Sequence, residues 1–309
     1  MPSKEVTAGP GLRLRAERRR IGEDVVKGVL AVCALVSVAT TVGIVVALFV
    51  PAFEFFGEVP LGDFLTGRDW APLFEPPRFG VLPLVTGTLL VTAIASAVAM
   101  PFGLGAAVYL SEYASPRVRG FLKPAFEVLA GIPTIVFGYF ALTFVTPLLR
   151  DLGVEVDIFN TLSAGLVMGV MLLPTVASLS EDAMGAVPRD LRDGAYALGS
   201  TKLQVATRIV VPAAVSGIIA SFVLAISRAV GETMIVLVAM GQQPKLTFDP
   251  REAAEAMTAF IAATGAGDVP TGSLEYKTIF AVGATLFVLT LAMNVVAIRL
   301  VRKYREVYE

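Results

Sequence analysis

The chain has no histidine and a single cysteine, Cys33, among its 309 residues. Histidine is the commonest general base at neutral pH and the commonest metal ligand, and one thiol forms neither an intramolecular disulfide nor a cysteine cluster. We therefore expect neither a metal site nor a hydrolase that uses a Ser-His or Cys-His pair. Cys33 gives no information on the redox compartment.

A phosphate-binding P-loop is also absent. No G-x-x-x-x-G-K-[ST] motif occurs, and no lysine follows a glycine. Any nucleotide that drives this protein must therefore be hydrolysed by another subunit. A membrane-embedded enzyme is an alternative, but the chain shows no obvious catalytic constellation, so we predict a non-catalytic subunit that binds no cofactor of its own.

Apolar residues dominate the chain instead. Hydrophobic residues make up 55% of the sequence and charged residues 17%, with a mean hydropathy of +0.75. These values are typical of a polytopic membrane protein, and the apolar stretches are long enough to cross the hydrocarbon core as helices. We predict an all-α polytopic membrane protein with one transmembrane domain at residues 28–300. Its six spans are expected at about 28–50, 81–110, 125–149, 159–180, 213–241 and 278–300.

The charges that flank the spans predict their orientation. Lys and Arg are concentrated in the tails at 1–27 and 301–309 and in the loops at 112–124 and 181–208, whereas the alternate loops are acidic. The positive-inside rule then places both termini in the cytoplasm. The basic N-terminal flank and first apolar run could also be a signal peptide. However, the run is longer than a typical h-region and no A-x-A site follows it, so we interpret it as a retained span.

The last outer loop contains a helix signal. Asp249-Pro250 reads as a cap followed by a first-turn proline, and apolar residues then recur at helical spacing. We predict a helix over 250–264. A surface helix resting on the bundle and a part of an outer gate both fit this pattern.

The cytoplasmic loop at 187–212 is charged, yet it also carries helix punctuation. Pro188 suits a first helical turn, Gly199 suits the residue just past a helix end, and Thr201-Lys202-Leu203-Gln204 has the pattern of a capping box. A solvated connector would need none of these features. We therefore predict two short helices at the water face.

Two ionisable residues, Arg228 and Glu232, lie inside the fifth apolar stretch, one helical turn apart. A charge near mid-membrane costs roughly 2.5–3.5 kcal/mol on insertion scales, and such residues normally mark a transport path. Arg offers planar donors to a phosphate-like oxyanion. The alternative is a structural ion pair. Glu232 would either orient Arg228 or become protonated, and the sequence does not choose between these.

Glycine and proline interrupt several of the apolar stretches. Most of these positions fit ordinary packing, including the small-xxx-small pair Gly165 and Gly169. Gly131-Ile132-Pro133-Thr134 is the best candidate for a lining segment, because a broken helix exposes amides and a hydroxyl where a cavity can satisfy them. The predicted pathway residues are Arg228, Glu232, Thr233, Gly131, Pro133 and Thr134.

The cytoplasmic loop also carries a gapped motif: Asp193-Gly194-Ala195, three residues, Gly199, nine residues, then Ile209-Val210-Val211-Pro212. It resembles the EAA loop of ABC importer permeases, E-A-A-x3-G-x9-I-x-L-P, from which Asp193, Gly194 and Val211 depart. In that family the loop is a coupling helix that docks in a groove of the ATPase subunit. An apolar face of Leu191, Ala195 and Leu198 is expected here. The ATPase-coupling residues that the resemblance implies are Leu191, Asp193, Gly194, Ala195, Leu198, Gly199, Ile209 and Pro212.

Three further segments look like parts of phosphate-specific permeases: Gly105–Tyr113, Leu129–Gly138 and Arg228–Met234. Over Phe79–Leu300 the chain resembles the PstC type most and the PstA type less. The resemblance implies a MetI-like fold of six helices in the cytoplasmic (inner) membrane. It also implies a PstA-like second permease, two PstB-like subunits that hold ATP and Mg, and a PstS-like extracytoplasmic phosphate-binding protein.

Two alternatives stay open on the sequence. One keeps the transporter class and changes the cargo to another oxyanion, such as phosphonate, sulfate or molybdate. The other is an ion-coupled secondary transporter or channel that uses Arg228 and Glu232. Inverted repeats would favour a secondary transporter, and we find none in the sequence.

Overall fold

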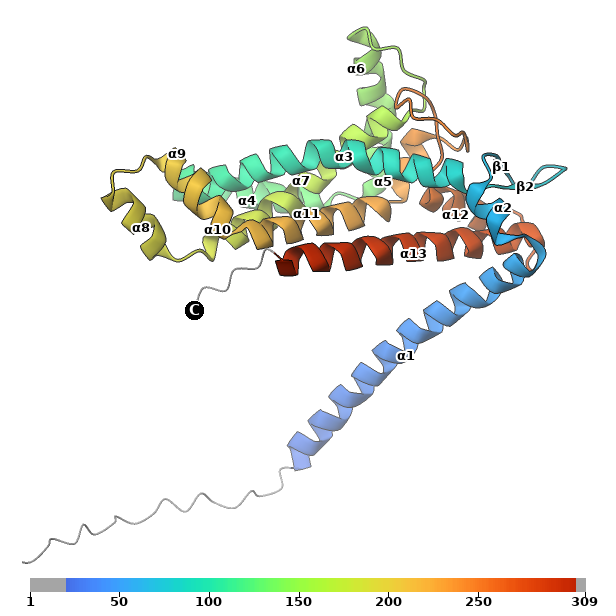
Figure 1. Ribbon diagram of the computed structural model, residues 1–309, viewed down its shortest axis with the longest axis horizontal. Helices are drawn as coiled ribbons and strands as arrows, with labels where there is room; N and C mark the ends of the chain where they lie inside the picture. Colours follow the sequence, from blue (N-terminus) through green and yellow to red (C-terminus); the bar gives the residue numbers. More distant parts are fainter. Residues whose placement is uncertain (1–20, 304–309) are drawn as a thin grey trace, which may run out of the picture. The chain divides into compact units, whose positions relative to one another are not determined.

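The structure, a computed structural model, describes residues 21–303 and is almost entirely helical there (Figure 1). The predicted basic tail at 1–27 and the tail at 301–309 lie mostly outside the described residues. The chain forms two compact units, Met1–Leu48 and Phe49–Glu309. The long helix α1 (Ile21–Glu58) contributes to both units.

Within residues 21–303, four helices are long and apolar enough to cross a membrane, or up to six if each of two bent pairs counts as one span. The four straight candidates are α1, α3 (Leu82–Val108) with its π-helical continuation η1 (Tyr109–Tyr113), α7 (Thr161–Gly185) and α13 (Leu274–Lys303). In the first unit, the apolar side chains of α1 are exposed, as lipid-facing side chains of a span would be.

The first bent pair covers the third predicted span, whereas the second begins in the predicted loop 187–212 and ends in the fifth predicted span. The first pair bends by 89° between α4 (Pro116–Gly131) and the helices that follow it, and the second by 71° before α11 (Val215–Val230). The helices after α4 are α5 (Thr134–Phe140), η2 (Ala141–Val145) and α6 (Thr146–Asp151). Those before α11 are α9 (Lys202–Val205), η3 (Ala206–Val210) and α10 (Val211–Ala213). The predicted spans 125–149 and 213–241 are thus not straight helices.

Helices α3 and α7 pack together along their length, and α11 lies against both (Figure 1). Glycine allows this close approach. A Cβ placed on Gly165 or Gly169 of α7 would lie 2.7 Å from a side-chain carbon of Ile94 or Val98 on α3. These distances confirm the predicted small-xxx-small contact. Buried apolar side chains of α3, α7 and α11 form the main core around this seam.

The two ends of the second unit carry the shorter elements. At one end, α2 (Leu61–Thr66), the hairpin of β1 (Trp70–Ala71) and β2 (Arg78–Phe79), and α12 (Met257–Gly265) enclose an aromatic cluster. The Trp70 and Phe260 rings meet edge to face there, 5.0 Å between centroids. At the opposite end, α8 (Arg189–Ala197) and α9 cover a smaller apolar cluster (Figure 1).

The predicted outer helix at 250–264 begins later, at Met257. The backbone N–H groups before it bond elsewhere: that of Arg251 to the Asp249 side chain, that of Ala253 to the Asp157 side chain, and that of Ala254 to the Met240 carbonyl. An Asx turn and two distant acceptors therefore replace the predicted first helical turns.

Candidate functional site

Arg228 lies in the last turn of α11, two residues before the helix ends at Val230. Its side chain is exposed, and its guanidinium donates a long hydrogen bond of 3.5 Å to the hydroxyl of Thr175 on α7. Within residues 21–303, no carboxylate lies within ion-pair distance of Arg228. The guanidinium therefore keeps most of its donors available for an anion.

Glu232 does not share a helical face with Arg228, because the fifth apolar stretch breaks between them and becomes helical again at Met234. The Glu232 carboxylate accepts from the backbone N–H groups of Met234 at 3.1 Å and Ile235 at 3.4 Å. Its carbonyl accepts from the Thr258 hydroxyl of α12 at 2.6 Å. Glu232 thus caps the helix that continues as η4 (Val236–Met240), with its negative charge at the favourable N-terminal end.

This geometry corrects the expectation of a clamp or resting ion pair between the two residues. Glu232 is buried, with 8% of its side chain exposed, and the described chain contains no ion pair that joins it to Arg228. The local sequence does not predict this break, because Arg-x-x-x-Glu in an apolar stretch is equally compatible with a continuous helix. The hydrogen bond from Thr258 supports the break from an element that is distant in sequence.

The two interrupted segments lie close together. Gly138 of α5 packs against the turn after Thr233: a Cβ at Gly138 would lie 3.2 Å from the Met234 carbonyl oxygen and 3.0 Å from Val238. The break at Ile132–Pro133 therefore begins a helix that rests on the helix capped by Glu232. Of the predicted pathway residues in the first break, Gly131 and Pro133 are exposed and Thr134 is half-buried. Thr233 is half-buried in the second break, and its hydroxyl bonds to the Gly231 carbonyl at 3.3 Å.

The 187–212 loop forms the two predicted helices, α8 and α9. Gly199 has a φ of +82°, the left-handed conformation that ends many helices. Both bonds of the capping box between Thr201 and Gln204 are present. Local side-chain chemistry therefore fixes this loop as the sequence indicates.

The exposed residues of this loop correct one expectation about its docking face. Leu198 is 89% exposed and Leu191 39% exposed, so both can meet a partner. Ala195 is only 6% exposed and packs inward on Val205 and Met184. Ala195 therefore packs beneath the docking face and is not part of its exposed surface. Of the other residues with predicted coupling roles, Ile209 is half-buried. The remaining four are exposed: Asp193, Gly194, Gly199 and Pro212.

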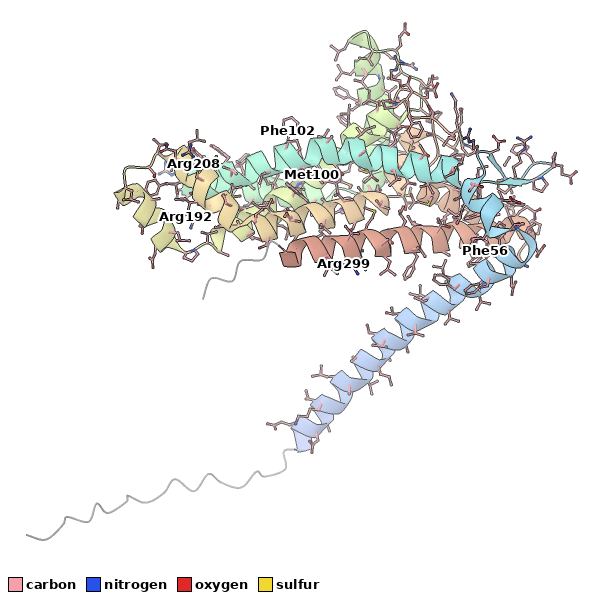
Figure 2. The ribbon with its side chains drawn as sticks, viewed as in Figure 1. Phe56, Met100, Phe102, Arg192, Arg208 and Arg299 are labelled. Carbon is pink, nitrogen blue, oxygen red and sulfur yellow. The ribbon has the colours of Figure 1, made fainter. Side chains whose placement is uncertain are left out.

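An ion pair that the motif did not indicate holds α8 to the body. The guanidinium of Arg192 donates to the carbonyls of Met184 at 2.7 Å and Val187 at 2.8 Å, at the end of α7 (Figure 2). It also pairs with Glu112 of η1 at 3.2 Å, and both side chains are mostly buried. The next residue of η1, Tyr113, has the Lys202 ammonium group of α9 5.3 Å from its ring centroid.

A second buried carboxylate joins α4 to α7. Glu181 of α7 has 4% of its side chain exposed and pairs with Arg119 at 3.2 Å and Lys123 at 2.9 Å. Arg119 also donates to the Leu110 carbonyl at 2.6 Å, in η1, which continues α3. The ends of α3, α4, α7 and α8 are therefore connected by charged side chains on the face that the positive-inside rule places in the cytoplasm.

Relatives by sequence are membrane transport proteins. Residues 99–306 match the family described as binding-protein-dependent transport system inner membrane component. The probable ABC transporter permease protein YqgH of Bacillus subtilis is 33% identical and covers 96% of each chain. The phosphate transport system permease protein PstC of Mesorhizobium japonicum is 31% identical and covers 82% of each chain. PstC 1 of Mycobacterium tuberculosis is 34% identical over 73% of each chain.

Solved structures with a similar fold are also ABC transporters. A bacterial alginate ABC transporter, in complex with an alginate pentasaccharide-bound periplasmic protein, has a TM-score of 0.65 at 16% identity, over 92% of this chain and 98% of that one. The inward-facing MetNI methionine ABC transporter has a TM-score of 0.56 at 18% identity, over 74% and 95%. These matches confirm the all-α, MetI-like fold. The chain therefore belongs to the family of binding-protein-dependent transport system inner membrane components.

Proposed function

We propose that this chain is the PstC-type permease subunit of an ATP-driven importer of inorganic phosphate. The observation that carries the proposal is Arg228: a permanent charge inside an apolar span, without a carboxylate partner in the described chain, two residues before its own helix ends. An oxyanion is the cargo that such donors suit. The relatives named as phosphate permeases support phosphate over phosphonate, sulfate or molybdate.

The proposed assembly has four chains and a binding protein that docks on it. This chain and a PstA-like permease form the path, and each contributes six spans with both termini in the cytoplasm. Two PstB-like subunits bind ATP and Mg and carry out the hydrolysis, so this chain is non-catalytic. A PstS-like protein delivers phosphate to the outer face. The fifth chain, the binding protein, is thus needed only for delivery.

The coupling follows from the order of elements. The exposed Leu191 and Leu198 of the 187–212 loop enter the ATPase groove, and ATP-driven closure of the ATPase pair moves the loop. This loop leads through the 71° bend into α11. Arg228 is 13 residues beyond the start of α11 at Val215, so the helix places it roughly 20 Å from the loop. Movement at the loop therefore displaces the anion-binding arginine.

Phosphate uptake by the reconstituted transporter tests this function. Proteoliposomes with all subunits and internal ATP should accumulate labelled phosphate, and Arg228→Ala should reduce the initial rate by tenfold or more. Arg228→Lys keeps the positive charge but not the planar guanidinium, so its initial uptake rate should lie between those of the parent and Arg228→Ala. Arg299→Ala, a change at an exposed arginine of α13, is the matched control and should import at the parent rate.

Three results would contradict the proposal. Normal uptake by Arg228→Ala would remove this residue from the path. Competition by excess sulfate or molybdate that equals competition by unlabelled phosphate would assign a different cargo. Uptake that proceeds without ATP but collapses with an ion gradient would instead support a secondary transporter.

A further inference from the structure

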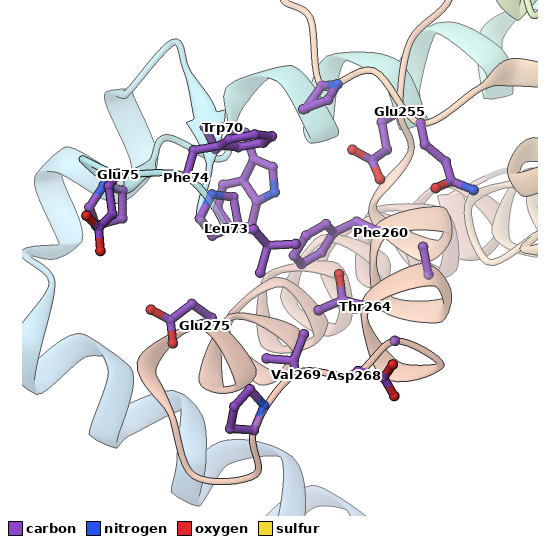
Figure 3. A pocket seen from close by; sticks show the side chains of 18 residues that line it. Trp70, Leu73, Phe74, Glu75, Glu255, Phe260, Thr264, Asp268, Val269 and Glu275 are labelled. Atoms are coloured by element: carbon purple, nitrogen blue, oxygen red, sulfur yellow. The ribbon is translucent and has the colours of Figure 1, made fainter.

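A pocket of about 730 Å³ lies at the end of the second unit that carries the β hairpin and α12 (Figure 3). Its walls come from the segment 70–77, from the segment 242–255 that precedes α12, from α12 itself and from the segment 267–275 that leads into α13. Aromatic rings of Trp70, Phe74 and Phe260 form part of the lining. No lysine or arginine is among the described lining residues, whereas four carboxylates are: Glu75, Glu255, Asp268 and Glu275.

Glu255 differs from the other three because it is buried. Only 5% of it is exposed, and its carboxylate points into the space between Trp70 and Phe260 (Figure 3). Within the described chain its carboxylate has neither a hydrogen-bond donor nor an ion-pair partner, and burial raises its pKa to about 7. Burying a carboxylate without a hydrogen-bond donor costs free energy. A donor or cation from another molecule would lower this cost at Glu255.

Four basic residues at this end do not supply that group, because each is already paired with another carboxylate. Lys245 binds Glu252 at 2.6 Å, and Arg251 binds Asp249 at 2.6 Å. The remaining pairs at this end are Arg78 with Asp69, and Lys277 with Glu54 and Glu58. These four basic side chains therefore do not neutralise the negative charge of the pocket.

The chemistry of the pocket selects the kind of partner. Phosphate would be repelled by the carboxylates. A metal ion does not fit, since the described residues contain no group of three or more side chains placed to ligate one. A basic side chain fits well: it pairs with a carboxylate, and aromatic faces also attract guanidinium and ammonium groups.

We propose that this pocket receives a lysine or arginine side chain from a surface loop of the extracytoplasmic binding protein, with Glu255 as its ion-pair partner. The inference rests on the proposed function, which supplies the binding protein and the outward orientation of this end. The lining residues all come from segments that this orientation places outside, which favours the binding protein over the ATPase subunits. Docking then neutralises a charge that the free permease leaves unpaired.

Docking affinity tests the proposal. The complete transporter would be placed in lipid nanodiscs, and the dissociation constant of its phosphate-loaded binding protein measured by biolayer interferometry. Glu255→Gln should weaken binding by about tenfold or more, because it removes one charge from a desolvated pair. The effect of added salt on the dissociation constant should also become smaller. Glu252→Gln is the matched control: the same change three residues away, at a carboxylate that is already paired, should leave affinity within twofold.

Three outcomes would contradict the proposal that the binding protein docks at this pocket. An unchanged dissociation constant for Glu255→Gln overturns the proposal, and so does an equal loss in Glu252→Gln. Loss of the second permease from purified Glu255→Gln transporter would assign the pocket to a contact between permeases instead. Asp268→Asn, at an exposed position, is a second variant that should weaken docking without altering the fold. Absence of phosphate uptake by the parent would refute the proposed function, whereas the dissociation constants decide the role of the pocket independently.

Discussion

The buried carboxylate of Glu255 predicts a pH dependence of stability that one substitution should remove. Burial raises the pKa of this carboxyl from its usual 4.5 to about 7 in the folded chain. Between these values the unfolded chain is ionised while the folded chain still holds the proton. The folded state therefore binds more protons in this window, and stability falls as the pH rises from 4.5 to 7.

The magnitude follows from the size of the shift. A shift of about 2.5 pKa units corresponds to about 3 kcal/mol at pH above 7, at roughly 1.4 kcal/mol per unit. Below pH 4.5 the carboxyl is protonated in both states and the cost vanishes. Glu255→Gln cannot ionise, so it should stabilise the chain by up to about 3 kcal/mol at pH 8 and by almost nothing at pH 4.5.

Thermal unfolding of the purified chain in detergent, followed by circular dichroism at pH 5 and pH 8, measures this difference. We expect Glu255→Gln to raise the midpoint by at least about 5 °C at pH 8, with a much smaller change at pH 5. Glu252→Gln should behave oppositely, because the bond from Lys245 lowers the pKa of Glu252 and its ionised form is the favoured one. Equal shifts of the Glu255→Gln midpoint at both pH values would refute the reasoning.

Three further predictions concern the helical body and the loop. Glu112→Gln should leave the buried Arg192 without its counter-charge, at a cost of about 1–3 kcal/mol, and should raise amide exchange in α8 by hydrogen–deuterium mass spectrometry. Leu198→Asp should abolish co-purification of the ATPase subunit without affecting the fold, since this side chain is 89% exposed; retention of the ATPase would contradict the docking role. Gly169→Val should destabilise the α3–α7 contact by about 1–3 kcal/mol, measured as a lower unfolding midpoint. Its control, Gly105→Ala, adds a Cβ in open space and should leave the midpoint unchanged.

The sequence predicted those features that depend on neighbouring residues. The capping box at Thr201, the left-handed Gly199 and the break at Pro133 each follow from one or two adjacent residues. The glycines of α7 were also predictable, because their spacing alone places both on one face. The class of fold needed only composition and the length of the apolar stretches.

The features that the sequence did not predict depend on distant segments. The break before Glu232 is supported by Thr258, and the late start of α12 by acceptors at Asp157 and Met240. The inward orientation of Ala195 requires knowledge of the cluster beneath α8. Hydrophobic periodicity indicates which residues share a helical face, but not which distant segments pack against that face. These three features therefore could be seen only in the tertiary structure.

The position of Trp70 gives the chain an optical reporter of its own. It is the single tryptophan of the sequence, it is 3% exposed, and it lines the acidic pocket with its ring edge to face against Phe260. The intrinsic indole emission of this chain therefore comes entirely from the pocket wall. A basic group that enters the pocket changes the electric field at that ring, so occupancy can be followed as a spectral shift without attaching a dye.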